Sequence, residues 1–95
     1  MKQIEDKYFI MIADYIKTFI DERGIDASDL AAAANVDRKQ VYRLINKENI
    51  PKLSTLIRIS LAAGIEPTKL FSRKFDFETY MKENNILTAN PKKKK

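Results

Sequence analysis

The feature that most constrains this chain is a pair of short helices predicted on the two sides of one tight turn. Asp26 and Asp37 each precede a stretch rich in helix-forming residues, and an aspartate at that position caps the free N–H groups of a helix. Asn35 lies between them and can adopt the left-handed backbone conformation that ends a helix. We therefore expect a helix after Asp26, a turn at Asn35 and a second helix over 38–46.

Apolar residues recur at spacings of three and four on both sides of this pair. They predict a long helix over 3–23, which Gly24 would end, and a helix over 53–63. A short helix would begin at Pro67 and run through Phe71, because proline favours the first turn. The expected fold is all-α: a five-helix bundle with an extended first helix and a C-terminal tail.

The tail after residue 71 allows two local structures. Asp76 could cap a helix over 77–84, whereas the alternation of Phe75 and Phe77 would suit a short strand. Residues 89–95 end in four lysines, and we expect a disordered basic tail there. This tail would either only solubilise the chain or hold it near phosphates.

Composition excludes several kinds of chemistry. The chain has no Cys and no His, which excludes disulfides, Cys/His zinc sites and histidine acid–base catalysis. No nucleophile–base set, metal cluster or Gly-rich phosphate loop occurs, so we expect no enzyme activity, no metal and no cofactor. No apolar run approaches the ~20 residues of a membrane span, and from this we expect a cytoplasmic protein with no membrane partner.

Positive charge is concentrated in the middle and at the end of the chain, whose net charge is +5. Residues 1–36 hold four Lys or Arg against seven Asp or Glu, whereas residues 37–52 hold five against two. Residues 53–95 hold nine against four, and four of those nine are the terminal lysines. This asymmetry indicates a polyanionic partner.

The predicted helix over 38–46 has one apolar and one polar side. At about 100° per residue, Val41, Leu44 and Ile45 share one side. The opposite side carries Arg38, Lys39, Tyr42, Arg43 and Asn46. Arginine can pair with both acceptors of guanine, and a helix fits a major groove about 12 Å wide. A tight turn and a basic second helix are typical of a helix-turn-helix, here over about 27–46, although a solvated helix surface would show the same polarity.

Five short runs of sequence occur in one register without a gap. They are Leu30-Ala31 followed by Asn35-Val36, Asp37 through Val41, Pro51 through Ile57, Ala63-Gly64-Ile65, and Leu70-Phe71. In this register, residues 16–71 resemble the phage-repressor family of helix-turn-helix proteins, also described as Cro-like or XRE-type. Each run alone is a weak signal, but five in one register are a strong one.

The resemblance implies a five-helix bundle that binds operator DNA, commonly as a two-fold dimer. Carried over by position, the contacts to DNA bases fall on Arg38, Lys39, Tyr42 and Arg43. The contacts to phosphates fall at the start of the second helix and after the third, on Ser28, Asn46, Lys47, Asn49 and Lys52.

Three features depart from the family pattern. The family often has glutamine where this chain has Ala27, and glycine where it has Lys47, so we expect the recognition helix to end differently here. A buried arginine–glutamate pair of many members falls on Ile20 and Ile45. Well-packed apolar residues can replace a buried ion pair without loss, and we predict that these two isoleucines touch.

Aromatic residues near both ends of the chain leave two interpretations open. These residues are Tyr8, Phe9, Phe75, Phe77 and Tyr80. They could cover one another within a single chain, or they could form the interface of a dimer. The apolar side of the first helix is larger than a minimal five-helix domain can cover, which favours the dimer interface.

Together these patterns favour a repressor-like transcriptional regulator that binds double-stranded DNA sequence-specifically, with the 38–46 helix in the major groove and a homodimer as the expected assembly. The alternative is an antitoxin or another adaptor of the same fold, whose protein partner would bind residues 72–88. We divide the chain into a helix-turn-helix domain over 1–71, a C-terminal extension over 72–88 and a basic tail over 89–95.

Overall fold

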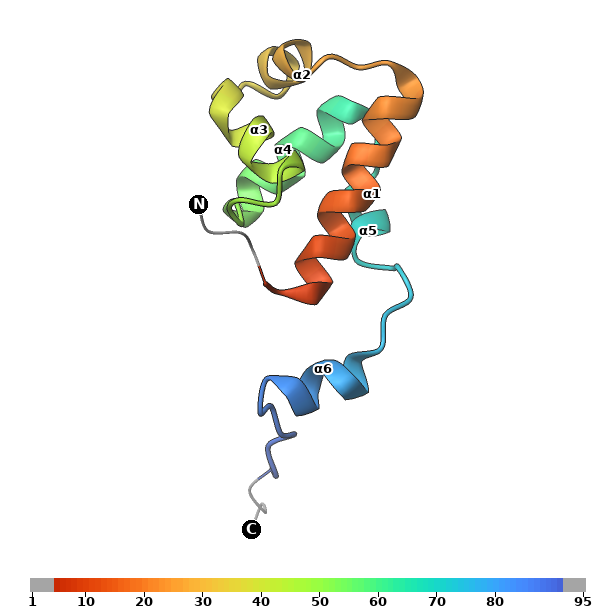
Figure 1. Cartoon of the computed structure of the whole chain (residues 1–95), viewed down its shortest axis with the longest axis vertical. Helices are drawn as coiled ribbons and strands as arrows, with labels where there is room; N and C mark the ends of the chain where they lie inside the picture. The colour runs from red at the N-terminus through yellow and green to blue at the C-terminus, as the bar shows by residue number, and fades with distance from the viewer. Residues whose placement is uncertain (1–4, 92–95) are drawn as a thin grey trace.

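The computed structural model describes residues 5–91, and helices are the only regular structure among them. Their order is α1 (Lys7–Arg23), α2 (Ala27–Ala34), α3 (Arg38–Ile45), α4 (Leu53–Ala63), α5 (Pro67–Leu70) and α6 (Phe77–Glu83). In Figure 1, α1 to α5 form one bundle, while α6 lies apart from it at the end of an extended linker. The all-α fold is confirmed, and no described helix is long and apolar enough to cross a membrane.

The first helix begins later than the apolar periodicity predicted. Residues 3–4 lie outside the described part of the chain, but Glu5 and Asp6 are not helical. Asp6 has an extended backbone, and its carboxylate accepts a hydrogen bond from the Phe9 N–H at 3.0 Å. The helix therefore starts at Lys7, because an aspartate N-cap satisfies a donor that would otherwise lack a partner.

Aspartates cap three further helices, as the sequence predicted. The caps of α2, α3 and α6 are Asp26, Asp37 and Asp76, and each carboxylate accepts a backbone N–H of the first turn. Asp76 also accepts the Thr79 hydroxyl at 2.6 Å, and this bond is the main reason that the pKa of Asp76 is lowered. The segment after Asp76 therefore forms the helix that the sequence allowed, and the alternative prediction of a strand is wrong.

Five of the six described helices end in the same arrangement. A left-handed residue after the helix donates its N–H to a carbonyl three residues back, and the next residue donates to one five residues back, which is the Schellman motif. The left-handed residues are Gly24, Asn35, Lys47, Gly64 and Asn85. After α3, the N–H of Lys47 donates to Leu44 at 3.0 Å and that of Glu48 to Arg43 at 2.8 Å. The expectation that α3 ends differently without glycine is wrong, because lysine itself adopts a φ of 58°.

The hydrophobic core draws on all five helices of the bundle. Its most deeply buried large side chains are Ile12, Ile16, Leu30, Val41, Leu44, Ile59 and Leu70. α2 packs against α3 and α4, and α1 contacts the same two helices. Ile20 is buried and Ile45 packs against the same cluster, so both lie in the core region, while direct contact between them stays a prediction.

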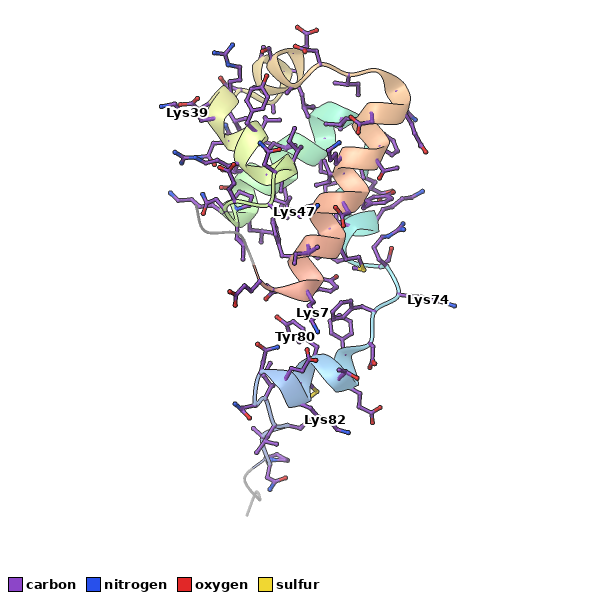
Figure 2. All side chains as sticks on the ribbon, in the orientation of Figure 1. Lys7, Lys39, Lys47, Lys74, Tyr80 and Lys82 are labelled. Carbon is purple, nitrogen blue, oxygen red and sulfur yellow. The ribbon has the colours of Figure 1, made fainter. Side chains whose placement is uncertain are left out.

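α6 is held against the start of α1 by aromatic side chains. The Tyr8 ring lies 5.0 Å from that of Phe75 and 5.1 Å from that of Phe77, measured between centroids. The Tyr80 hydroxyl donates to Asp6 at 2.6 Å, which raises the pKa of Tyr80. Figure 2 shows Tyr80 and Lys7 in the space between the two helices. The rings therefore contact one another within one chain, as the first interpretation expected, while the dimer interface stays a prediction.

Phe9 is buried in the bundle, whereas the residues after α6 are exposed. Phe9, considered above together with the other aromatic residues, is a core residue at 7% exposure. Residues 84–91 follow α6 without regular structure, and Leu87 is 88% exposed. Residues 92–95, the terminal lysines, lie outside the described residues.

Replacing Tyr8 by alanine should release α6 while leaving the bundle folded. α6 has seven residues, none of them buried, and a helix this short is not stable alone. We expect the backbone amides of α6 to exchange faster with deuterium, with those of α2 to α4 unchanged. Leu87→Ala is the control, because Leu87 is almost fully exposed. Equal protection of α6 in both variants would contradict the aromatic attachment.

Candidate nucleic-acid interface

The turn between α2 and α3 fixes how α3 is presented. Asn35 has left-handed backbone angles (φ 57°, ψ 48°), and Asp37 is extended (φ −64°, ψ 136°) and caps α3. The chain therefore passes from α2 into α3 through a turn of three residues. Val41 and Leu44 have no exposed surface, which fixes the rotation of α3 about its own axis.

The other side of α3 is open to solvent. Its four predicted base-contacting residues are all exposed, namely Arg38, Lys39, Tyr42 and Arg43. Tyr42 is 42% exposed although it is a large aromatic residue. In Figure 2, Lys39 projects from the edge of the molecule, away from the bundle. The structure thus brings these four side chains together on one surface, which we call the outer face of α3.

The cations of the outer face have no partner within the described chain. Within residues 5–91, no hydrogen bond or ion pair joins the side chain of Arg38, Lys39 or Arg43 to another residue. Three fixed positive charges next to one another favour an external anion. The outer face can therefore donate hydrogen bonds to phosphates or to the acceptor atoms of base edges.

Lys52 has surroundings that suit the phosphate contact expected of it. It is exposed and stands at the N-cap position of α4, where no side chain caps the helix. The first turn of α4 carries no acidic residue. Positive side-chain charge and free backbone N–H groups therefore lie together at this point. Asn49 and Asn46, expected to contact phosphates, are also exposed near this loop.

Ser28 is less well placed for a phosphate. Its backbone N–H donates to the Asp26 carboxylate at 3.0 Å, and the Asp29 N–H points to the same oxygen at 3.4 Å. A carboxylate thus occupies the start of α2, where a phosphate was expected to bind. Ser28 belongs to the first turn of α2 and is not part of the outer face of α3.

Lys47 points away from the outer face. Its ammonium lies 2.7 Å from a carboxylate oxygen of Asp14 on α1. In Figure 2, Lys47 is seen where the loop after α3 passes α1. Lys47, an expected phosphate-contacting residue, is therefore already in an ion pair with a carboxylate.

Two residues of this region were not singled out from the sequence. Asp14 is one, and Arg58 of α4 is the other: its guanidinium donates to the backbone carbonyl of Asn35 at 3.3 Å. This bond braces the turn between α2 and α3. Neither residue has a local signal, because each partner is distant in the sequence. Among the described residues no cluster of His, Cys, Asp and Glu could hold a metal ion.

Comparison with known proteins identifies the family of this chain. The sequence model of the helix-turn-helix family, of the XRE or Cro/C1 type, matches residues 16–70. The match covers more than half of the 95 residues, and the chain belongs to this family of DNA-binding regulators. No curated protein and no solved structure matches significantly.

Substitutions on the two sides of α3 should affect stability very differently. Leu44→Ala should lower the free energy of unfolding by about 2–5 kcal/mol, because it leaves a cavity at a fully buried site. Arg43→Ala should change it by less than about 0.5 kcal/mol, since the side chain is exposed. Urea titration measures both values. A loss in Arg43→Ala as large as in Leu44→Ala would show that Arg43 supports the fold.

Proposed function

We propose that this chain is a repressor-like transcriptional regulator that binds double-stranded DNA sequence-specifically, with α3 in the major groove. The observation that carries the proposal is the outer face of α3. There, three cations without a partner among residues 5–91 and a tyrosine lie on the exposed side of a helix anchored by buried Val41 and Leu44. A helix of this diameter fits the major groove, and its exposed side chains then reach base edges.

Each side chain of the outer face has a role that its chemistry suits. Arg38 and Arg43 can each donate two hydrogen bonds to guanine, and Lys39 can reach the same edge as a single donor. Tyr42 offers a hydroxyl to a base and an apolar ring to a thymine methyl group. Because the N-terminal part of a recognition helix lies nearest the bases, Arg38 and Lys39 are expected deepest in the groove.

The residues around α3 would position it through the DNA backbone. Lys52 at the start of α4 is the strongest candidate, and Asn46 and Asn49 lie in the same loop region. Contacts to phosphates carry no sequence information but fix the register of the protein on the duplex. Ser28 contributes least in this scheme, because its own N–H already donates to the Asp26 carboxylate.

The alternative of an antitoxin or adaptor has less support. It relied on the aromatic C-terminal extension as the surface for a protein partner. Tyr8, Phe75, Phe77 and Tyr80 pack against one another, so these rings are less available to a partner. A homodimer remains part of the proposal, since the family commonly binds two-fold symmetric operators.

Selection of bound sites from random duplex DNA tests the proposed function directly. We expect an enriched motif with guanine at positions contacted by the arginines, and a palindrome if a dimer binds. The spacing of the two half-sites would then give the spacing of the two recognition helices. Failure to enrich any motif, with no binding to duplex DNA at low salt, would falsify the proposal.

Arg43→Ala should weaken binding to the preferred site and relax specificity at one base pair. Loss of a bidentate contact to guanine costs about 1–3 kcal/mol. Titration against the selected site and single-base variants of it measures the effect. An equal loss on every variant would show that Arg43 contacts the backbone instead.

Lys52→Ala should weaken binding to all sequences by a similar factor. Removing one phosphate contact lowers the slope of log affinity against log salt by about 1. The measurement is a salt titration on the selected site and on an unrelated duplex. Ser54→Ala is the matched control, because Ser54 is exposed in the same first turn of α4 and carries no charge.

A further inference from the structure

The backbone at Lys47 has a left-handed conformation that disfavours lysine. Of the five left-handed residues that end helices in the described chain, four are glycine or asparagine, and Lys47 is the exception. A lysine in this conformation brings its β-carbon close to the following carbonyl oxygen. Backbone strain of this kind persists where the surrounding structure holds it, and it is enriched at functional sites.

The side chain of Lys47 connects the end of the recognition helix to α1. Its ammonium lies 2.7 Å from Asp14, and the exposed fractions of the two side chains are 31% and 54%. An ion pair that solvent reaches is weak, because water and salt screen it. The contact is therefore strong enough to orient Lys47 but weak enough to open when another anion competes.

We propose that Asp14 holds Lys47 as a stand-in for a DNA phosphate, so that DNA must displace Asp14 before Lys47 can bind its backbone. This inference rests on the proposed function and adds a residue that weakens DNA binding at the same surface. Carboxylate and phosphate oxygens are equivalent acceptors for an ammonium group. Lys47 directly follows the α3 cap, within reach of a strand that α3 would engage. Asp14 is thus a positioning residue that lowers affinity for DNA.

A purely structural role of the pair predicts different behaviour. If Lys47 and Asp14 only brace α1 against the loop after α3, then removing the carboxylate loosens α3 and weakens DNA binding. If Asp14 competes with phosphate, then Lys47 contacts DNA in only some of the wild-type complexes, and removing the carboxylate charge strengthens binding and raises the mean number of phosphate contacts. The salt dependence separates the two, because it counts neutralised phosphates.

The test compares Asp14→Asn with the wild-type chain on duplex DNA over a range of salt concentrations. We expect an affinity about two- to fivefold higher, the range that follows from loss of an exposed ion pair. We also expect a steeper slope of log affinity against log salt, with a change of about 0.9 if Lys47 gains one whole phosphate contact. Circular dichroism and thermal unfolding show whether the variant keeps its fold.

Asp21→Asn is the matched control. Asp21 lies on the same helix, makes a similar ion pair with Lys17 at 2.8 Å, and is 61% exposed at its side chain. The substitution changes net charge by the same amount as Asp14→Asn. It should raise affinity less and leave the salt slope unchanged, because Lys17 is not part of the DNA surface.

The Lys47→Gly background tests whether the effect passes through Lys47. Glycine fits the left-handed position and removes the cation. In this background Asp14→Asn should give no more gain than Asp21→Asn, and the slope should stay constant. The wild-type chain, Asp14→Asn, Lys47→Gly and the variant with both substitutions form a double-mutant cycle for Asp14 and Lys47.

Three results would overturn the inference while leaving the proposed function intact. They are an Asp14→Asn variant that matches Asp21→Asn, one that binds DNA more weakly or unfolds, and a gain that persists in Lys47→Gly. A wild-type chain that binds no duplex at low salt would overturn both the inference and the proposed function.

Discussion

The packing of α3 on the core is the interaction on which the rest of the interface depends. Val41 and Leu44 are fully buried, and they lie one turn apart on the same side of a helix of eight residues. Their burial decides which residues face outward, because rotation of α3 by half a turn would bury cations and expose leucine. The cost of burying an unpaired charge makes that alternative unfavourable. A short helix is thereby held in one orientation by two side chains and a tight turn.

Local chemistry made much of this fold predictable from the sequence. Asp26, Asp37 and Gly24 act at the helix ends where their side chains or backbone freedom indicated. The bounds of α4 agree with its apolar periodicity, because Leu56, Ile59 and Ala63 are buried at spacings of three and four. The same reasoning placed α1 too early, since periodicity does not register that Asp6 caps the helix.

Contacts between distant residues were beyond such reasoning. The pair Lys47–Asp14 and the bond from Arg58 to Asn35 each join segments that only the tertiary fold brings together. Exposure of Arg38 and Arg43 was predictable from helix periodicity, but the pairing of Lys47 was not, because long side chains choose among several neighbours. The family pattern itself marks Lys47 as unusual without saying what its side chain does.

One carboxylate near the start of the chain links its two ends. One oxygen of Asp6 accepts the Phe9 N–H at 3.0 Å, and the other accepts the Tyr80 hydroxyl at 2.6 Å. Initiation of the longest helix is therefore coupled to a residue 74 positions later in the chain. Loss of the Tyr80 bond would leave one oxygen of the α1 cap without this donor, so the start of α1 and α6 are coupled through a single carboxylate.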